Sequence, residues 1–507
     1  MFFSTQYILG QNKWARVPNP NGGGAAFEVF GENYYRMPSN FLETKSFANK
    51  SIQQEITLPN EKGEEEVFLI TPAPLLSESL LAKYPKIKTF KGRSKSRPKV
   101  QLRLSTLPNG INAWLRFKEG SDYFIQPAKG QRQYHFSYLK TQRDISTPLI
   151  CKTEAELSKH KQSSNTSKSQ LLNDQLRTFR IAVAGTAEYT EFWGDDDDSN
   201  GTNAEDAFAA VASTINRINV IFENDLNIRL ELVSDAEIIY EDSATDPFTG
   251  NFDVELQAIL DEQIGDENYD VGHLFDFGEP NGDAGCIGCV CVSGEKGQGF
   301  STHPFRDIFG GEFRNDYFDL DYAGHEIGHQ FGAYHTFSHV TESAGVNAEP
   351  GSGSTIMGYA GITGSDDIQE HGDPYFHYFS IQNILSYVET LSCGETEDLG
   401  LEIFTIDAGP DYVIPIETAY ELKIDPIEDE AYYTYCWEQL DNGKITSSNF
   451  GPENLLGAMT RSLPPTEASN RYIPKINRIL SDELTEENPR INSDWETVSS
   501  VGRILNW

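Results

Sequence analysis

The stretch that decides the fold is Tyr322-Ala-Gly-His-Glu-Ile-Gly-His-Gln-Phe-Gly-Ala-Tyr-His335. His325 and His329 are four residues apart, which places both side chains on one face of a helix, about a turn from each other. Glu326 lies on the same turn, but its offset directs it toward a water at the site rather than toward a metal. The spacing therefore predicts a helix that carries two metal ligands and a carboxylate with a separate task.

Gly332 and His335 add a third ligand beyond the end of that helix. A glycine can adopt the left-handed backbone that commonly ends a helix, so the chain can turn back and bring in His335. Three neutral nitrogen donors with one open position are typical of a catalytic zinc site, because structural zinc sites fill all four positions. The chain has 10 histidines among 507 residues. The alternative, a helix with solvated histidines, is therefore disfavoured.

The downstream sequence narrows the class of site. Ser354-Thr-Ile-Met-Gly-Tyr359 follows His335 and supplies a methionine turn. Together with the H-E-x-x-H-x-x-G-x-x-H pattern, this turn makes up the metzincin signature. The chain thus resembles a metzincin zinc metallopeptidase. The stretches 349–362 and 335–337 are similar to the reprolysin-like enzymes that Bacteroidetes secrete.

The site and the resemblance together predict a secreted zinc endopeptidase that hydrolyses internal bonds of a protein or peptide substrate. Zinc would be held by His325, His329 and His335, with Met357 as an apolar floor beneath the three rings. Glu326 would take a proton from water as general base and pass it to the leaving amine. The competing prediction from another class is a surface-binding or adhesion protein that retains a latent or inactive metalloprotease scaffold.

Two positions beside the motif leave the subfamily open. Tyr359 stands two residues after Met357, where astacins and serralysins carry a tyrosine that can bind zinc and stabilise the oxyanion. Thr336 follows the third histidine, where reprolysins proper have aspartate. We therefore keep two roles for Tyr359, one as a catalytic or metal-binding residue and the other in packing.

Charge divides the chain into unlike parts. Residues 1–175 carry 25 Lys and Arg against 15 Asp and Glu, whereas residues 176–400 carry 7 against 43. This asymmetry marks a boundary and predicts attraction between the two parts, although acidity that serves only solvation is an alternative. A metal site in so acidic a region disfavours nucleic acid as a partner. The sequence has no apolar run long enough for a membrane span, and we expect a monomer.

The basic N-terminal part has the layout of an inhibitory segment. Short strands at period two precede a polar linker and the acidic region, which is the order of a zymogen. Cys151 could place its thiolate on the fourth zinc position and keep the enzyme latent, or it could be an inert buried thiol. The predicted boundaries are 1–10 for a truncated signal remnant or a first strand, 11–157 for a β-rich propeptide, 158–175 for the linker, 176–394 for the catalytic domain and 395–507 for a PKD/Ig-like β-sandwich.

The catalytic domain is predicted as an α/β fold with a twisted mixed sheet above the zinc helix. The expected strands are 177–184, 228–233, 237–240 and 270–275, and the expected helices are 204–222, with Asn203 as N-cap, 254–264, 320–333 and 378–390. His273 fits a role in packing or on a polar strand face. Four other histidines are expected in loops or on the surface, namely His303, His339, His371 and His377.

Cysteines and acidic runs carry further predictions. Cys286, Cys289 and Cys291 invite a metal-cluster interpretation, but no second pair at zinc-ribbon spacing follows, so disulfides are favoured, with Cys393 as partner of one of them. The acidic run 195–198 could bind calcium through oxygen ligands, or it could be a solvated turn. In the C-terminal part, alternating strands and Trp437 as a core residue are expected.

Overall fold

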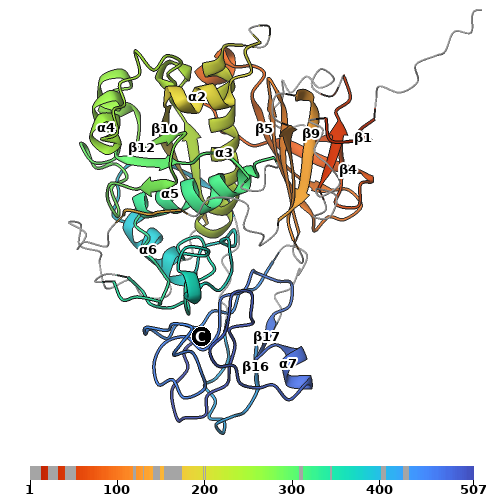
Figure 1. The fold of residues 1–507 in the computed structure, drawn as a ribbon, viewed down its shortest axis with the longest axis vertical. Coiled ribbons are helices and arrows are strands. Elements are labelled where there is room, and N and C mark those ends of the chain that lie inside the picture. The colour runs from red at the N-terminus through yellow and green to blue at the C-terminus, as the bar shows by residue number, and fades with distance from the viewer. Residues whose placement is uncertain are drawn as a thin grey trace, which may run out of the picture.

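The computed structural model describes most of the chain in three parts (Figure 1). The described residues are 13–20, 32–39, 41, 53–117, 121–128, 131–140, 149–153, 174–197, 199, 201–307, 312–342, 345–400, 407–425 and 433–507. The predictions for residues 1–10 and for linker residues 158–173 lie outside the described residues.

The N-terminal part is a curled antiparallel sheet, drawn in red to orange in Figure 1. Its strand order among the described residues is β1-β2-β9-β8-β7-β6-β5-β4-β3. Side chains alternate between two faces, so Phe68 and Leu104 fill a core of their own, whereas Trp114 and Phe136 join the core of the next part. The elements are β1 Ala15–Val17, β2 Asn33–Arg36, β3 Gln54–Pro59, β4 Glu65–Pro72, α1 Glu78–Lys83, β5 Lys88–Ser94, β6 Gln101–Leu107, β7 Gly110–Arg116, β8 Tyr123–Ala128 and β9 Gln131–Leu139.

The central part has a mixed sheet in the order β11-β10-β12-β14-β13. Strands β10, β11, β12 and β14 run parallel, and β13 lies antiparallel at one edge. The predicted mixed α/β architecture is confirmed. Its elements are β10 Gln175–Gly185, α2 Ala187–Trp193, α3 Asn203–Leu226, β11 Ile228–Leu232, α4 Phe252–Gln263, β12 Val271–Asp276, β13 Asn281–Asp283, β14 Gly299–Thr302, η4 Tyr317–Gly324, α5 His325–Gln330, α6 Tyr378–Val388 and β15 Glu395–Asp398.

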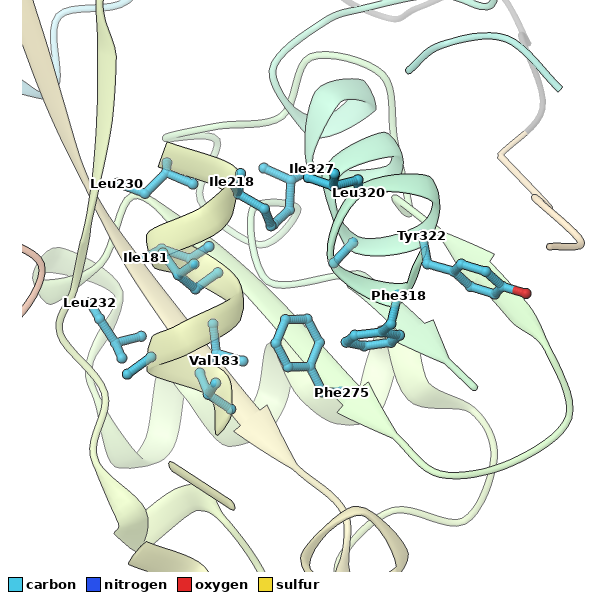
Figure 2. Packing of buried hydrophobic residues seen from close by; sticks show 14 of the residues in the cluster. Ile181, Val183, Ile218, Leu230, Leu232, Phe275, Phe318, Leu320, Tyr322 and Ile327 are labelled. Carbon is cyan, nitrogen blue, oxygen red and sulfur yellow. The ribbon is translucent and has the colours of Figure 1, made fainter. Parts of the chain in front are cut away.

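The two faces of this sheet bury different helices because side chains alternate along β10. Ile181 and Val183 pack with Ile218 of α3 and with Ile327 of α5 in one cluster (Figure 2). On the opposite face, Ala182 and its neighbours pack against α4. The helix that carries the histidines is therefore held against the sheet by apolar contacts on its far side, which leaves its polar face for the site.

Three predicted local features differ from the structure. The side chain of Thr202 caps α3 and forms a capping box with Glu205, so Asn203 is the first helical residue instead of the cap. The predicted strand at 237–240 is reduced to a parallel bridge between Ile239 and Gly185. A 3₁₀ turn at Ala236–Ile238 precedes it, where the Asp235 carboxylate accepts a hydrogen bond from the backbone amide of Glu237 at 2.8 Å. The predicted zinc helix is split into a wide π-type turn, η4, followed by the short α5.

The C-terminal part, blue in Figure 1, contains few regular elements among its described residues. These are β16 Tyr420–Lys423, β17 Asn470–Ile473 and the short helix α7 Ile476–Leu480. A β-sandwich here stays a prediction. Trp437 is only partly buried, whereas Trp495 is fully buried in a small cluster with Ile368 of the central part. This cluster attaches the C-terminal part to the domain that carries the histidines.

Candidate active site

The three histidines of the motif converge on one point. Nε2 of His329 lies 3.2 Å from Nε2 of His325 and 3.0 Å from Nε2 of His335. Gly332 makes this possible, because its φ of 102° ends the helix while its amide donates to the His329 carbonyl at 2.8 Å. A Cβ at Gly332 would stand 2.9 Å from the Cβ of Tyr387, so side-chain bulk is excluded there as well.

The three imidazole rings are neutral, and each has an Nε2 lone pair available to bind a metal. Nδ1 of His325 donates to the Ile356 carbonyl and Nδ1 of His329 to the Ala333 carbonyl, both at 2.7 Å. Burial lowers the pKa of His325 to about 4 and lowers that of His329 and His335 as well. With their protons on Nδ1, the rings point unprotonated Nε2 lone pairs at one another. That arrangement fits a bound cation, and an all-imidazole donor set suits zinc.

Glu326 is the fully buried carboxylate of the site. Burial raises the pKa of Glu326 to about 8, with Asp283 adding to the rise. Gly282, in the edge strand β13, faces it so closely that any Cβ there would collide with the Glu326 carboxylate. The glycine therefore leaves the space in which this carboxylate lies beside the three histidines.

Met357 lies beneath the histidine helix. A Cβ at Gly328 would stand 2.8 Å from the Met357 sulfur, so the small residue in the motif lets the methionine turn approach the helix. Tyr359 lies above, with its ring centroid 4.5 Å from that of His335 and 5.9 Å from that of His325. The structure thus brings Met357 and Tyr359 to the site from a segment well beyond the histidine motif.

A buried carboxylate that sequence reasoning missed joins the third histidine to the methionine turn. Glu349 accepts the hydroxyl of Thr336 at 2.6 Å and the backbone amide of Ser354 at 2.8 Å. The Thr355 hydroxyl also donates to Glu349, at 2.5 Å. Thr336, the residue after the third histidine, is therefore hydrogen-bonded to a carboxylate from another part of the sequence, Glu349. No spacing in the sequence indicates this pairing.

Residues 149–153 lie along the edge strand β13 and reach the site. Cys151 pairs in parallel with Gly282, the amide of Lys152 donates to the Gly282 carbonyl at 2.8 Å, and the Gly282 amide donates to the Ile150 carbonyl at 3.0 Å. Leu149 and Thr153 are buried, whereas Ile150 is 60% exposed. In an extended segment alternate side chains share a face, so residues 149, 151 and 153 all face the protein.

Cys151 and Thr153 contact the predicted catalytic residues directly. The Cys151 sulfur lies 3.9 Å from Nε2 of His329 and 3.7 Å from Nε2 of His335. Its sulfur and one nitrogen from each of the three histidines lie within 4.8 Å of one another. The Thr153 hydroxyl lies 3.0 Å from Oε2 of Glu326 and 3.3 Å from Oδ1 of Asp283, and it accepts the amide of Ala284 at 2.8 Å.

The other histidines are more buried than predicted. His273 is confirmed in the core, between Gln330 at 3.0 Å and Ser301 at 2.9 Å. His303, His371 and His377 lie in loops, as one of the two expected placements, but they are buried instead of exposed. His303 packs in an aromatic cluster, His371 pairs with Asp321, and His377 caps α6. In each case tertiary packing encloses a loop. His339 lies in a loop and is partly exposed.

The disulfide prediction is confirmed. Cys393 is bonded to Cys291, and Cys286 is bonded to Cys289. The loop 286–291 contacts the end of the histidine helix, since the amide of Cys289 donates to the Gln330 carbonyl at 3.0 Å.

In the acidic run 195–198, the carboxylates of Asp195 and Asp197 each accept a hydrogen bond from the backbone amide two residues further on, as in solvated turns. Calcium binding there stays a prediction. Among the described residues, no helix has the length and apolar character needed to cross a bilayer.

The central part of the chain matches a known protein family. Residues 175–390 match the family model described as metallo-peptidase family M12B reprolysin-like, and this match supports a zinc metallopeptidase. A solved structure, metalloproteinase-II from Bacteroides fragilis, is similar at 10% identity with a TM-score of 0.35, covering 67% of this chain and 92% of that one. No curated protein matches the sequence.

Proposed function

We propose that this chain is a zinc-dependent metzincin endopeptidase made as a latent precursor. One observation carries the proposal: three neutral imidazoles converge, with Nε2 of His329 3.2 Å and 3.0 Å from Nε2 of the other two, beside the fully buried carboxylate of Glu326. His325, His329 and His335 would hold the metal. The alternative, an adhesion protein on an inactive scaffold, is not favoured, because the ligand set and the carboxylate are both in place.

The chain's own residues divide the reaction between them. Zinc, when bound, supplies a Lewis acid that polarises the scissile carbonyl and makes water a better nucleophile. Glu326 accepts the proton of the attacking water and delivers it to the leaving amine, because its buried carboxylate lies beside the three histidines. The hydroxyl of Tyr359, whose ring lies next to His335, would donate to the carbonyl oxygen as negative charge develops.

The edge strand β13 offers a backbone on which a substrate can be held. Residues 149–153 use it in this structure, which supports the proposal that they occupy the substrate's place. A pocket next to Tyr359 is lined by Leu149 together with Tyr322 and Ile356, and it would receive an apolar substrate side chain after the segment leaves. Peptides that add to a sheet edge bind mainly through backbone hydrogen bonds.

The N-terminal part would keep the enzyme latent in two ways. Cys151 stands where its sulfur can fill the open metal position, and Thr153 engages the carboxylate of the general base. Cleavage of the linker at 158–175 would let the N-terminal part dissociate, which would free both the metal position and the carboxylate of the general base. Two disulfides favour an oxidising compartment, which supports the proposal that the enzyme is secreted.

The test is to measure metal content and proteolysis on the same preparation. We expect one zinc per chain, and cleavage of casein that appears after the linker is cut and is abolished by a chelator. Glu326→Gln is the matched control, since it should keep zinc and lose cleavage by at least about a thousandfold, as expected for removal of a general base with its electrostatic role. A zinc-free protein with an intact fold would overturn the proposal.

A further inference from the structure

The three histidines differ in what supports their outer nitrogens. His325 and His329 each donate Nδ1 to a backbone carbonyl. His335 instead donates to a side chain, because both carboxylate oxygens of Glu342 lie near its Nδ1, at 3.0 Å and 2.9 Å. His335 is therefore the one of the three whose outer nitrogen faces an acidic side chain.

His335 also needs this support more than the other two. His325 and His329 belong to α5, whose packing on the sheet sets their direction. His335 follows the glycine that ends the helix, so no regular element orients its ring. A partner on Nδ1 is then the means by which the ring plane and the tautomer are set.

The loop after His335 is built to hold Glu342 in this place. The Asn347 side chain donates to the carbonyls of Phe337 at 2.8 Å and Val340 at 2.7 Å, and so ties the two sides of the loop together. The backbone amide of Val346 donates a hydrogen bond to the His335 carbonyl at 3.1 Å. Gly345 provides the space, since a Cβ there would stand 3.1 Å from the Cβ of Glu342.

We infer that Glu342 is a positioning residue for the metal site, which keeps the proton of His335 on Nδ1 and strengthens Nε2 as a donor. The inference rests on the proposed function, because it assumes that the three histidines hold zinc. The side chain of Glu342 is 21% exposed and that of His335 is 1% exposed, so solvent screens this pair only in part. Outer carboxylates of this kind commonly change metal affinity by about 10- to 100-fold.

The experiment measures the zinc dissociation constant of the full-length chain by competition with a chromophoric chelator. Glu342→Ala should weaken zinc binding about 10- to 100-fold, and Glu342→Gln, which keeps an acceptor oxygen without the charge, should fall between that variant and the parent. Glu370→Ala, which removes a partly buried carboxylate from the same domain, should leave the constant unchanged.

A second measurement separates positioning from general damage. Cobalt-substituted Glu342→Ala should show a shifted visible absorption band, while thermal unfolding of the metal-free protein stays within a few degrees of the parent. Zinc affinity of Glu342→Ala within twofold of the parent would overturn the inference. If the parent itself binds no zinc, the proposed function fails instead, so the two failures are distinguishable.

Discussion

At the scale of single residues, the site is determined by which polar atoms are left facing one another. The Nε2 atoms of the three histidines converge because each Nδ1 is already engaged. Cys151 and Thr153 then approach the same point from a segment far away in the chain. Their two contacts differ in kind, since one concerns the proposed metal position and the other the carboxylate of the proposed general base.

Two substitutions should separate these contacts. Cys151→Ala in the uncleaved chain should raise casein cleavage at least about tenfold, because nothing then fills the open metal position. Thr153→Val removes one hydrogen bond to a carboxylate, worth about 1.5–3 kcal/mol, and should also raise activity, by about tenfold. Lys152→Ala, on the exposed face of the same segment, is the control and should stay latent. Unchanged latency in Cys151→Ala would remove the thiol from the mechanism.

At the scale of elements, the position of His335 depends on where the short helix α5 ends. It ends at Gln330, and Gly332 at φ 102° redirects the chain so that His335 returns to the first two histidines. A longer helix would carry His335 round to another face. The wide η4 turn before α5 is π-type helix, a form that is frequent at functional sites.

Replacing Gly332 by alanine should damage both stability and metal binding. A side chain in this backbone conformation costs about 1–3 kcal/mol, and its Cβ would crowd Tyr387. We expect a lower thermal midpoint and weaker zinc binding. Gly250→Ala is a matched control, because φ there is 109° with nothing within 4 Å, so it should lose some stability and keep its zinc affinity. Equal zinc affinity in both variants would contradict the role given to Gly332.

At the scale of the whole molecule, the basic N-terminal part is held on the acidic central part by cross-domain ion pairs. Arg103 pairs with Glu223 of α3 at 3.1 Å, and Lys83 pairs with Asp235 at 2.6 Å. The first pair is nearly buried, with side-chain exposures of 5% and 14%. The attraction that the uneven charge predicts between the two parts of the chain thus includes these specific ion pairs.

The buried pair predicts how stability depends on pH. Burial by itself would raise the pKa of Glu223, but Arg103 and Arg229 outweigh it and lower this pKa to about 2. A depressed carboxyl pKa stabilises the fold above its unfolded value near 4.5 and loses that contribution as pH falls toward 2. The shift corresponds to about 3 kcal/mol.

Unfolding free energies of the parent and of Glu223→Gln, measured by denaturant titration between pH 7 and pH 2.5, check this prediction. The difference between the two proteins should be about 3 kcal/mol at neutral pH and should shrink as the pH falls below 4.5. A constant difference across this range would show that Glu223 does not titrate as its contacts imply.

Local spacing accounts for much of the site. The i, i+4 histidines with a glycine three residues after the second predict the ligand set, and alternating apolar residues predict the strands of the N-terminal sheet that the structure confirms. The N-cap was predicted wrongly at Asn203, and the predicted strand at 237–240 is paired only at Ile239, because the side chains of Thr202 and Asp235 accept backbone hydrogen bonds that compete with the regular pattern.

The sequence by itself determined which residues form the core of the candidate site, because three imidazoles, a carboxylate and a helix-ending glycine lie within eleven residues and helical geometry relates them. Only the tertiary structure decided what surrounds that chemistry. Glu349, Glu342 and Thr153 reach the site through loops and through pairing with an edge strand. Such contacts depend on how distant segments pack against each other, so the periodicity of the sequence does not predict them. Cys151 was a candidate from its position alone, and the fold is what places its sulfur beside the histidines.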